Sequence, residues 1–117
     1  MTQVKWMKCA GEVWCPLVTI NVDHAYFDNV EGVYIIWHGG NSPATVYIGK
    51  GNIRAEIKAR RTDPRLQPYT NLGLYVTWAS VSPSDRDGIQ ISLSTKLDPK
   101  VRDGVTSGVP IEVNTPW

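Results

Sequence analysis

The tripeptides Gly32-Val33-Tyr34 and Tyr47-Ile48-Gly49 are the part of this sequence best suited to chemistry, since they place two tyrosines only thirteen residues apart. A basic stretch follows at once, at residues 50–65. A local excess of positive charge is typical of a surface that contacts phosphate. The two tyrosines bring hydroxyl groups to the same part of the chain.

The two tyrosines are expected to share one face of a β-hairpin. Residues 33–38 and 45–49 are apolar, β-branched and aromatic, which predicts two strands joined by a six-residue loop. This loop would set His38 opposite Thr45 and Tyr34 opposite Gly49. Because side chains alternate along each strand, Tyr34 and Tyr47 should then point to the same side.

The basic stretch holds six lysines and arginines against two acids, although the net charge of the whole chain is only +1. Arg54, Lys58 and Arg61 are about one turn apart and would form a stripe along a helix. Lys50 lies between two glycines just before that helix, at an N-terminus where anions are favoured. These features predict a surface that contacts phosphate. The alternative is an ordinary solvated helix face.

The elements that position these residues follow from local signals. Asn52 is a good N-cap, and the helix after it should end at Arg61 or Thr62, before Asp63-Pro64. Ser82-Pro83 predicts the start of a second helix that continues to Leu97. The remaining expected elements are a third strand over residues 74–81, a strand or extended cover over 17–22, and an extended tail over 110–117.

The order of these elements predicts an α+β fold, in which a small three-stranded antiparallel sheet is flanked by helices. A chain of 117 residues is long enough for one core. Without repeats or linkers, residues 1–117 are expected to form a single domain.

In the order and spacing of these features, the chain resembles the GIY-YIG superfamily of metal-dependent nucleases, which is named after two such tripeptides. The resemblance covers residues 32–117 and leaves residues 1–31 as an N-terminal cover segment. It implies a GIY-YIG-like sheet, and a site in which Tyr34 or Tyr47 orients or deprotonates water. Asn114 matches the late asparagine that helps to hold the site in that family.

Two charged positions of the family are replaced in this chain. Glu56 stands nine residues past the second tyrosine, where the family has an arginine. Gln90, in Gln90-Ile91-Ser92-Leu93, stands where the family has a metal-binding glutamate. A carboxylate near the scissile phosphate would repel it, and a neutral amide binds Mg²⁺ or Mn²⁺ more weakly than a carboxylate does.

Other residues could substitute for these two. Asp87, one turn before Gln90, is a candidate metal ligand, although an acid early in a helix is also favoured by the helix dipole. Arg54 and Arg60 are candidate replacements for the arginine, although each is expected on a different helix face. Without such a role, Glu56 is expected to pair with Arg60 one turn later.

The sequence therefore predicts a nuclease-like domain that binds nucleic-acid phosphate and cleaves it weakly or not at all, with little or no affinity for Mg²⁺ or Mn²⁺. The first alternative is an active metal-dependent endonuclease with relocated charges. The second is a protein-interaction module that keeps only the fold, so a protein partner stays open. The expected phosphate contacts are Lys50, Arg54, Lys58 and Arg61. The residues expected to converge on one concave surface are Tyr34, Tyr47, Glu56, Gln90 and Asn114.

Cys9 and Cys15 have no second pair with which to form a zinc site, and reduced thiols are expected; a disulfide or a metal site with His24 are the alternatives. No stretch approaches the roughly 18 apolar residues of a membrane-spanning helix, and the start lacks the form of a signal peptide. A cytoplasmic protein without a membrane partner is expected. The five tryptophans suggest stacking on bases, but Trp37 and Trp78 are expected to pack in the core.

Overall fold

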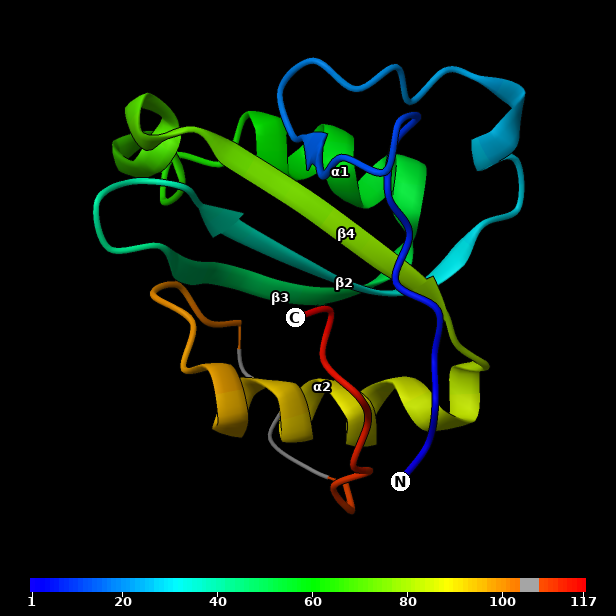
Figure 1. The fold of residues 1–117 in the computed structure, drawn as a ribbon. Helices are drawn as coiled ribbons and strands as arrows, with labels where there is room; N and C mark the ends of the chain where they lie inside the picture. The colour runs from blue at the N-terminus through cyan, green and yellow to red at the C-terminus, as the bar shows by residue number, and fades with distance from the viewer. Residues whose placement is uncertain (104–107) are drawn as a thin grey trace.

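A four-stranded antiparallel sheet lies at the centre of the computed structural model, which describes residues 1–103 and 108–117. Its spatial order is β1 (Cys15–Pro16), β4 (Leu74–Ser80), β2 (Glu31–His38) and β3 (Ala44–Asn52). Helix α1 (Ile53–Arg61) packs on one face and α2 (Pro83–Leu97) on the other, as Figure 1 shows. The fold is α+β, as the sequence predicts. The two-residue strand β1 extends the expected three-stranded sheet to four.

Both main helices begin where the sequence predicts. The side chain of Asn52 accepts a hydrogen bond of 3.0 Å from the backbone N–H of Ala55 and so caps α1. Helix α2 starts at Pro83, but the Ser82 hydroxyl bonds to the Asp85 carboxylate at 3.1 Å instead of capping the backbone. Two short 3₁₀ helices, η1 (Ala25–Phe27) and η2 (Gln67–Leu72), complete the elements.

The hairpin of β2 and β3 has the predicted register over most of its length. Tyr34 lies opposite Gly49, as expected, but His38 lies opposite Ala44 and not Thr45. The pairing shifts by one residue because Val46 is an extra residue in β3, a β-bulge. The loop is accordingly one residue shorter than expected.

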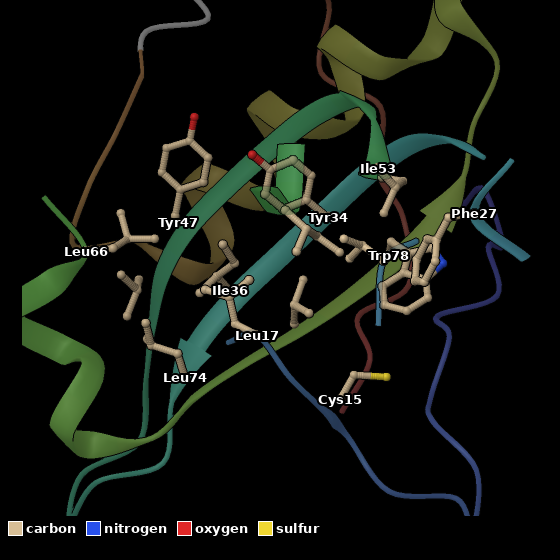
Figure 2. Packing of buried hydrophobic residues seen from close by; sticks show 14 residues of the cluster. Cys15, Leu17, Phe27, Tyr34, Ile36, Tyr47, Ile53, Leu66, Leu74 and Trp78 are labelled. Carbon is tan, nitrogen blue, oxygen red and sulfur yellow. The ribbon is translucent and has the colours of Figure 1, made fainter. Parts of the chain in front are cut away.

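The sheet separates two hydrophobic clusters. The cluster toward α1 contains Tyr34 and Tyr47 together with Ile53 and Ile57 of the helix, and Figure 2 shows its packing. The cluster toward α2 contains residues from the alternate positions of the same strands, packed on Ile89 and Leu93. Tyr34 and Tyr47 therefore share one face, and that face belongs to α1.

The first thirty residues run along the sheet and then over α1. The backbone N–H of Met7 donates to the carbonyl of Trp78 at 2.9 Å, and the N–H of Leu17 donates to that of Leu74 at 2.9 Å. Residues 17–19 form a turn, so this region covers the core without being a strand. Near the chain ends, Thr2 pairs in parallel with Val113 of the extended tail. Within the described ranges, no helix is both long and apolar enough to span a bilayer.

Cys9 and Cys15 are joined in a disulfide, so the expectation of reduced thiols is wrong for this structure. A tight turn, in which Cys9 pairs with Val13, brings the two Cα atoms to 5.2 Å. Because both sulfurs are bonded to each other, a metal site with His24 is not formed. Disulfides are typical of oxidising compartments. The cytoplasmic location stays a prediction, and this bond argues against it.

Replacing both cysteines by serine should lower the free energy of unfolding by about 2 kcal/mol, because the short loop is no longer closed in the unfolded chain. Urea denaturation of the parent and the double variant measures the difference. The parent in reductant should match the variant. Two free thiols in the untreated folded protein would contradict the disulfide.

Candidate active site

The glycine of each tripeptide permits a close approach that a side chain would block. A Cβ on Gly49 would lie 2.3 Å from the hydroxyl oxygen of Tyr34, so the tyrosine ring passes directly across this strand. A Cβ on Gly32 would lie 1.9 Å from the carbonyl oxygen of Ala79 on the neighbouring strand. The two glycines therefore have a packing role that does not depend on catalysis.

Tyr34 and Tyr47 form a pair beneath α1, with ring centroids 5.9 Å apart. The Tyr34 hydroxyl donates to Oε1 of Glu56 at 2.8 Å, and the Tyr47 hydroxyl donates to Oδ2 of Asp103 at 2.5 Å. Tyr34 is fully buried and Tyr47 nearly so. Each hydroxyl thus donates a hydrogen bond to a different carboxylate of the same chain.

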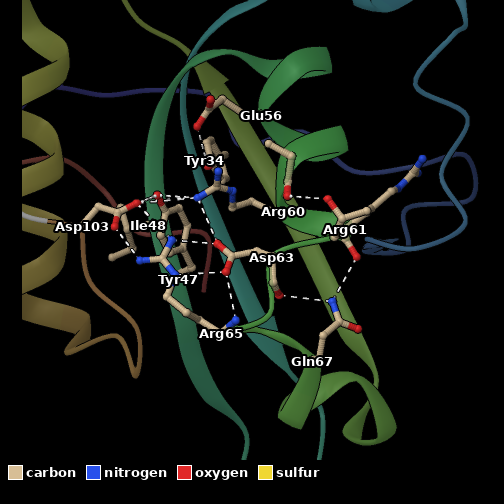
Figure 3. Close-up of polar contacts among 12 residues, drawn as sticks. Tyr34, Tyr47, Ile48, Glu56, Arg60, Arg61, Asp63, Arg65, Gln67 and Asp103 are labelled. Atoms are coloured by element: carbon tan, nitrogen blue, oxygen red, sulfur yellow. Dashed lines mark hydrogen bonds and ion pairs between the residues drawn. The ribbon is translucent and has the colours of Figure 1, made fainter.

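Two arginines complete this arrangement, which Figure 3 shows. Nη1 of Arg60 donates to the Tyr47 hydroxyl at 3.0 Å and lies 3.3 Å from Oδ2 of Asp63. Arg65 bridges two acids, at 2.7 Å from Oδ2 of Asp63 and 2.6 Å from Oδ1 of Asp103. With two arginines and three carboxylates, the group carries a net charge of −1. We call it the tyrosine cluster: Tyr34, Tyr47, Glu56, Arg60, Asp63, Arg65 and Asp103.

The environment keeps both tyrosines protonated at neutral pH. Burial, followed by the charges of Tyr47 and Glu56, raises the pKa of Tyr34 well above its usual range. Burial and the hydrogen bond to Asp103 raise the pKa of Tyr47 to about 12. Hydrogen bonds from Arg65 and then Tyr47 lower the pKa of Asp103 to about 2. A phenolate that could deprotonate water is therefore disfavoured at either tyrosine.

The structure brings Glu56 to the tyrosines, in contact with Tyr34 instead of the expected partner Arg60. Arg60 was expected on a different helix face, yet it reaches Tyr47. The difference arises because the long side chain of Arg60 extends from the last turn of α1 to Tyr47. Helical spacing alone therefore does not predict which residues such a side chain contacts.

Gln90 and Asn114 do not join the tyrosine cluster. Nε2 of Gln90 donates to the carbonyl of Ile48 at 3.1 Å, at the edge of β3. Asn114 makes two hydrogen bonds with the backbone of Val4, accepting at 2.7 Å and donating at 2.9 Å. These two residues therefore make no direct contact with the tyrosines among the described residues, because α2 and the tail pack on the opposite face of the sheet. Gln90 nevertheless lines one pocket together with Asp103 of the cluster, and the convergence of all five residues on one surface stays a prediction.

The residues proposed as metal ligands do not fit a Mg²⁺ or Mn²⁺ ion. Asp87 forms an ion pair with Lys50. Gln90 offers one neutral oxygen, Oε1, which is buried and has no hydrogen-bond partner among the residues that the structure describes. A hard divalent cation prefers several oxygen ligands with negative charge. Among the described residues, no group of three or more His, Cys, Asp or Glu side chains is arranged to hold a metal.

The basic stripe faces the N-terminal cover segment. Arg54 donates to the carbonyls of Val22 and His24 at 2.7 and 3.0 Å, and to Asp28 at 2.8 Å. Arg61 likewise donates to the carbonyls of two residues, Leu17 at 2.8 Å and Ile20. Lys58 pairs with Asp23 at 3.0 Å. Carbonyls in a covering loop need donors, and the arginines of α1 provide them.

Asp103 and Arg65 belong to the cluster, although no motif or spacing in the sequence predicted a role for either residue. Asp103 arrives because the chain after α2 follows the edge of β3: the N–H groups of Lys100 and Val101 donate to the carbonyls of Thr45 and Val46 at 3.1 and 2.8 Å. A sequence pattern predicts which side of a helix or strand a side chain occupies, but not a contact between residues far apart in the chain.

No protein-family model, curated protein or solved structure matches this chain. The resemblance to the GIY-YIG superfamily therefore depends on the sequence motifs alone.

Replacing Gly49 by alanine should lower the free energy of unfolding by about 1 to 3 kcal/mol, because the new methyl group overlaps the Tyr34 ring. Urea denaturation measures this cost. In a Tyr34→Leu background the same alanine should cost less, because leucine has no ring to cross the strand. An equal cost in both backgrounds would mean that Tyr34 does not lie over Gly49.

Tyr47 should ionise only near pH 12, and Asp103→Asn should lower its pKa because the negative acceptor that disfavours the phenolate is removed. The step is measured as the difference in phenolate absorbance between each protein and its Tyr47→Phe counterpart. Asp98→Asn is the matched control, since this exposed acid lies outside the cluster and should leave the step in place. An unchanged pKa in Asp103→Asn would contradict the hydrogen bond.

Proposed function

We propose that this chain is a GIY-YIG-like domain that binds nucleic-acid phosphate and cleaves it weakly or not at all. The observation that carries the proposal is the tyrosine cluster. Its two tyrosines share one face of the sheet, but both hydroxyls donate to carboxylates of the chain. Hydroxyls that are bonded to carboxylates of the same chain are poorly placed to activate water, which supports weak or absent cleavage.

Weak or absent cleavage is supported by charge and by proton affinity. The raised pKa values of both tyrosines leave no strong base there at neutral pH. Arg60, the cation nearest to Tyr47, also faces Asp63 and Asp103. The net charge of −1 provides no general attraction for a phosphate that is itself negative.

Phosphate binding is supported by two partly exposed lysines, Lys50 near the end of β3 and Lys58 on α1. Lys50 and Lys58 are 38% and 53% exposed and pair with Asp87 and Asp23, which are more exposed still. Ion pairs of this kind are weak because water and salt screen them. A phosphate can therefore replace either carboxylate at little cost. Arg54 and Arg61 differ, because they hold the cover segment in place.

The second candidate is a protein-interaction module that has lost nucleic-acid binding. It is favoured by the engagement of Arg54 and Arg61 with the backbone of their own chain, which removes half of the expected phosphate contacts. An active endonuclease with relocated charges has support from Arg60 beside Tyr47 but not from Asp87, which pairs with Lys50.

Salt dependence distinguishes binding residues from structural ones. The logarithm of affinity for duplex DNA should fall linearly with the logarithm of salt concentration, and Lys50→Ala with Lys58→Ala should reduce that slope by about 1.8. Arg61→Ala should instead lower the free energy of unfolding by about 1 to 3 kcal/mol, because two carbonyls lose a charged donor. Fluorescence anisotropy and urea denaturation measure the two effects.

Lys5→Ala serves as the control, because Lys5 is an exposed lysine outside α1 and its flanks and should leave the slope nearly unchanged. No binding at low salt would favour the interaction module. Cleavage by the parent in Mg²⁺ or Mn²⁺, abolished by Asp87→Asn, would overturn the proposal in favour of the endonuclease.

A further inference from the structure

A groove of about 580 Å³ lies on the side of the sheet that faces α2, away from the tyrosine cluster. Its walls are Trp14, Trp37 and Trp117, the start of β3, and the end of α2 with Lys96 and Lys100. In Figure 1 the C-terminus lies between the sheet and α2. Its last residue, Trp117, lines the groove, and none of the proposed phosphate contacts at Lys50 and α1 does.

The three tryptophans form one aromatic surface. Trp37 packs against Trp14 and Trp117 with ring centroids 5.2 and 4.9 Å away, and on its strand side it stacks on Tyr75. Trp37 is 9% exposed and forms the floor, whereas Trp117 is 56% exposed. An exposed indole face beside a buried one is a platform on which a flat ring can stack.

The groove tryptophans also differ from the other two in their hydrogen bonding. The indole N–H of Trp6 donates to the carbonyl of Asn114 at 2.8 Å, and that of Trp78 donates to the Tyr26 hydroxyl at 3.1 Å. The indoles of the three groove tryptophans donate to no acceptor within the described part of the chain. Their indole N–H groups are therefore not committed to acceptors of the described chain and can donate to a ligand that has acceptor atoms.

Positive charge without a partner gathers at the same place. In the ranges that the structure describes, every arginine is engaged by a carboxylate or a carbonyl, and Lys50 and Lys58 are paired. Of the lysines that make no ion pair there, Lys96 and Lys100 line the groove, and Nζ of Lys8 lies 4.6 Å from the ring centre of Trp14. Asp98, an acid on the rim, is neutralised by Arg102.

We propose that this groove binds single-stranded nucleic acid, with an unpaired base stacked on Trp117 and the adjoining phosphates at Lys96 and Lys100. This inference rests on the proposed function, because that function is the reason for taking a nucleic acid as the ligand. Charge complementarity selects a polyanion, the indole donors suit the acceptor atoms of a base, and stacking requires a base face that a duplex hides. The inference adds the class of nucleic acid and a second contact surface.

Two kinds of variant separate stacking from charge. Binding of a labelled oligothymidylate is measured by fluorescence anisotropy. Trp117→Ala should weaken this binding about 10-fold without changing the slope of log affinity against log salt concentration, because a stacking contact and not a phosphate contact is lost. Lys96→Ala with Lys100→Ala should reduce the slope by about 1.4, close to 0.7 for each single-strand phosphate contact. Trp117→Phe keeps a ring and should retain most of the affinity.

Matched controls use residues outside the groove. Lys5→Ala removes another unpaired lysine and should reduce the slope less than Lys100→Ala does. A hairpin duplex of the same length should bind more weakly than the single strand and should be insensitive to Trp117→Ala. Urea denaturation of each variant checks that the fold is kept, which is expected because Trp117 is exposed.

The outcomes distinguish this inference from the proposed function. If the parent and Trp117→Ala bind the single strand equally, while Lys50→Ala and Lys58→Ala still weaken binding, the inference about the groove is wrong and the proposed function stands. If binding of the single strand depends on Trp117 and Lys96 but not on Lys50 or Lys58, the groove is the binding site and the proposed phosphate contacts at Lys50 and Lys58 are wrong. No binding of any nucleic acid at low salt, with binding of polyglutamate that Trp117→Ala abolishes, would overturn both and assign the groove to an acidic protein partner.

Discussion

The passage of the Tyr34 ring across Gly49 is the constraint on which the α1 face depends. The ring fits only because β3 has no side chain at that point, and it leaves a hydroxyl in a fully buried place. A buried hydroxyl without a partner costs about 1 to 3 kcal/mol, so α1 must supply one. Glu56 does so. The carboxylate that departs from the family pattern is thus explained by the fold, whatever its effect on phosphate chemistry.

Local signals in the sequence predicted much of this fold. Asn52 and Pro83 mark the helix starts because capping and proline geometry act within a few residues. The shared face of the tyrosines follows from strand alternation. The bulge at Val46 could not be predicted, because no glycine marks an extra residue at that point of the strand. The candidate site was predicted less well than the fold, since Asp103 reaches Tyr47 only because the chain after α2 runs along β3.

The charge pattern of the sequence predicted the position of the basic residues along α1 correctly, but not the groups that they bind. The stripe of Arg54, Lys58 and Arg61 lies along one side of α1 as expected, yet its arginines bond to backbone carbonyls of the cover segment. An arginine offers five donors in a fixed fork, so it can fasten an irregular loop that lacks its own ladder of hydrogen bonds. The disulfide between Cys9 and Cys15 fastens the start of the same segment. A basic face can therefore indicate a bound loop as readily as a bound ligand.

The chain after α2 also closes the outer edge of the sheet. Carbonyls of Thr45, Val46 and Ile48 on β3 accept from Lys100, Val101 and Gln90, and the opposite edge is the two-residue strand β1. A strand edge with free backbone groups invites pairing with other chains, and here little of either edge is open to it. Self-association by strand addition is disfavoured as a result. Recognition of a partner by this fold is therefore expected to use side chains more than backbone pairing at a sheet edge.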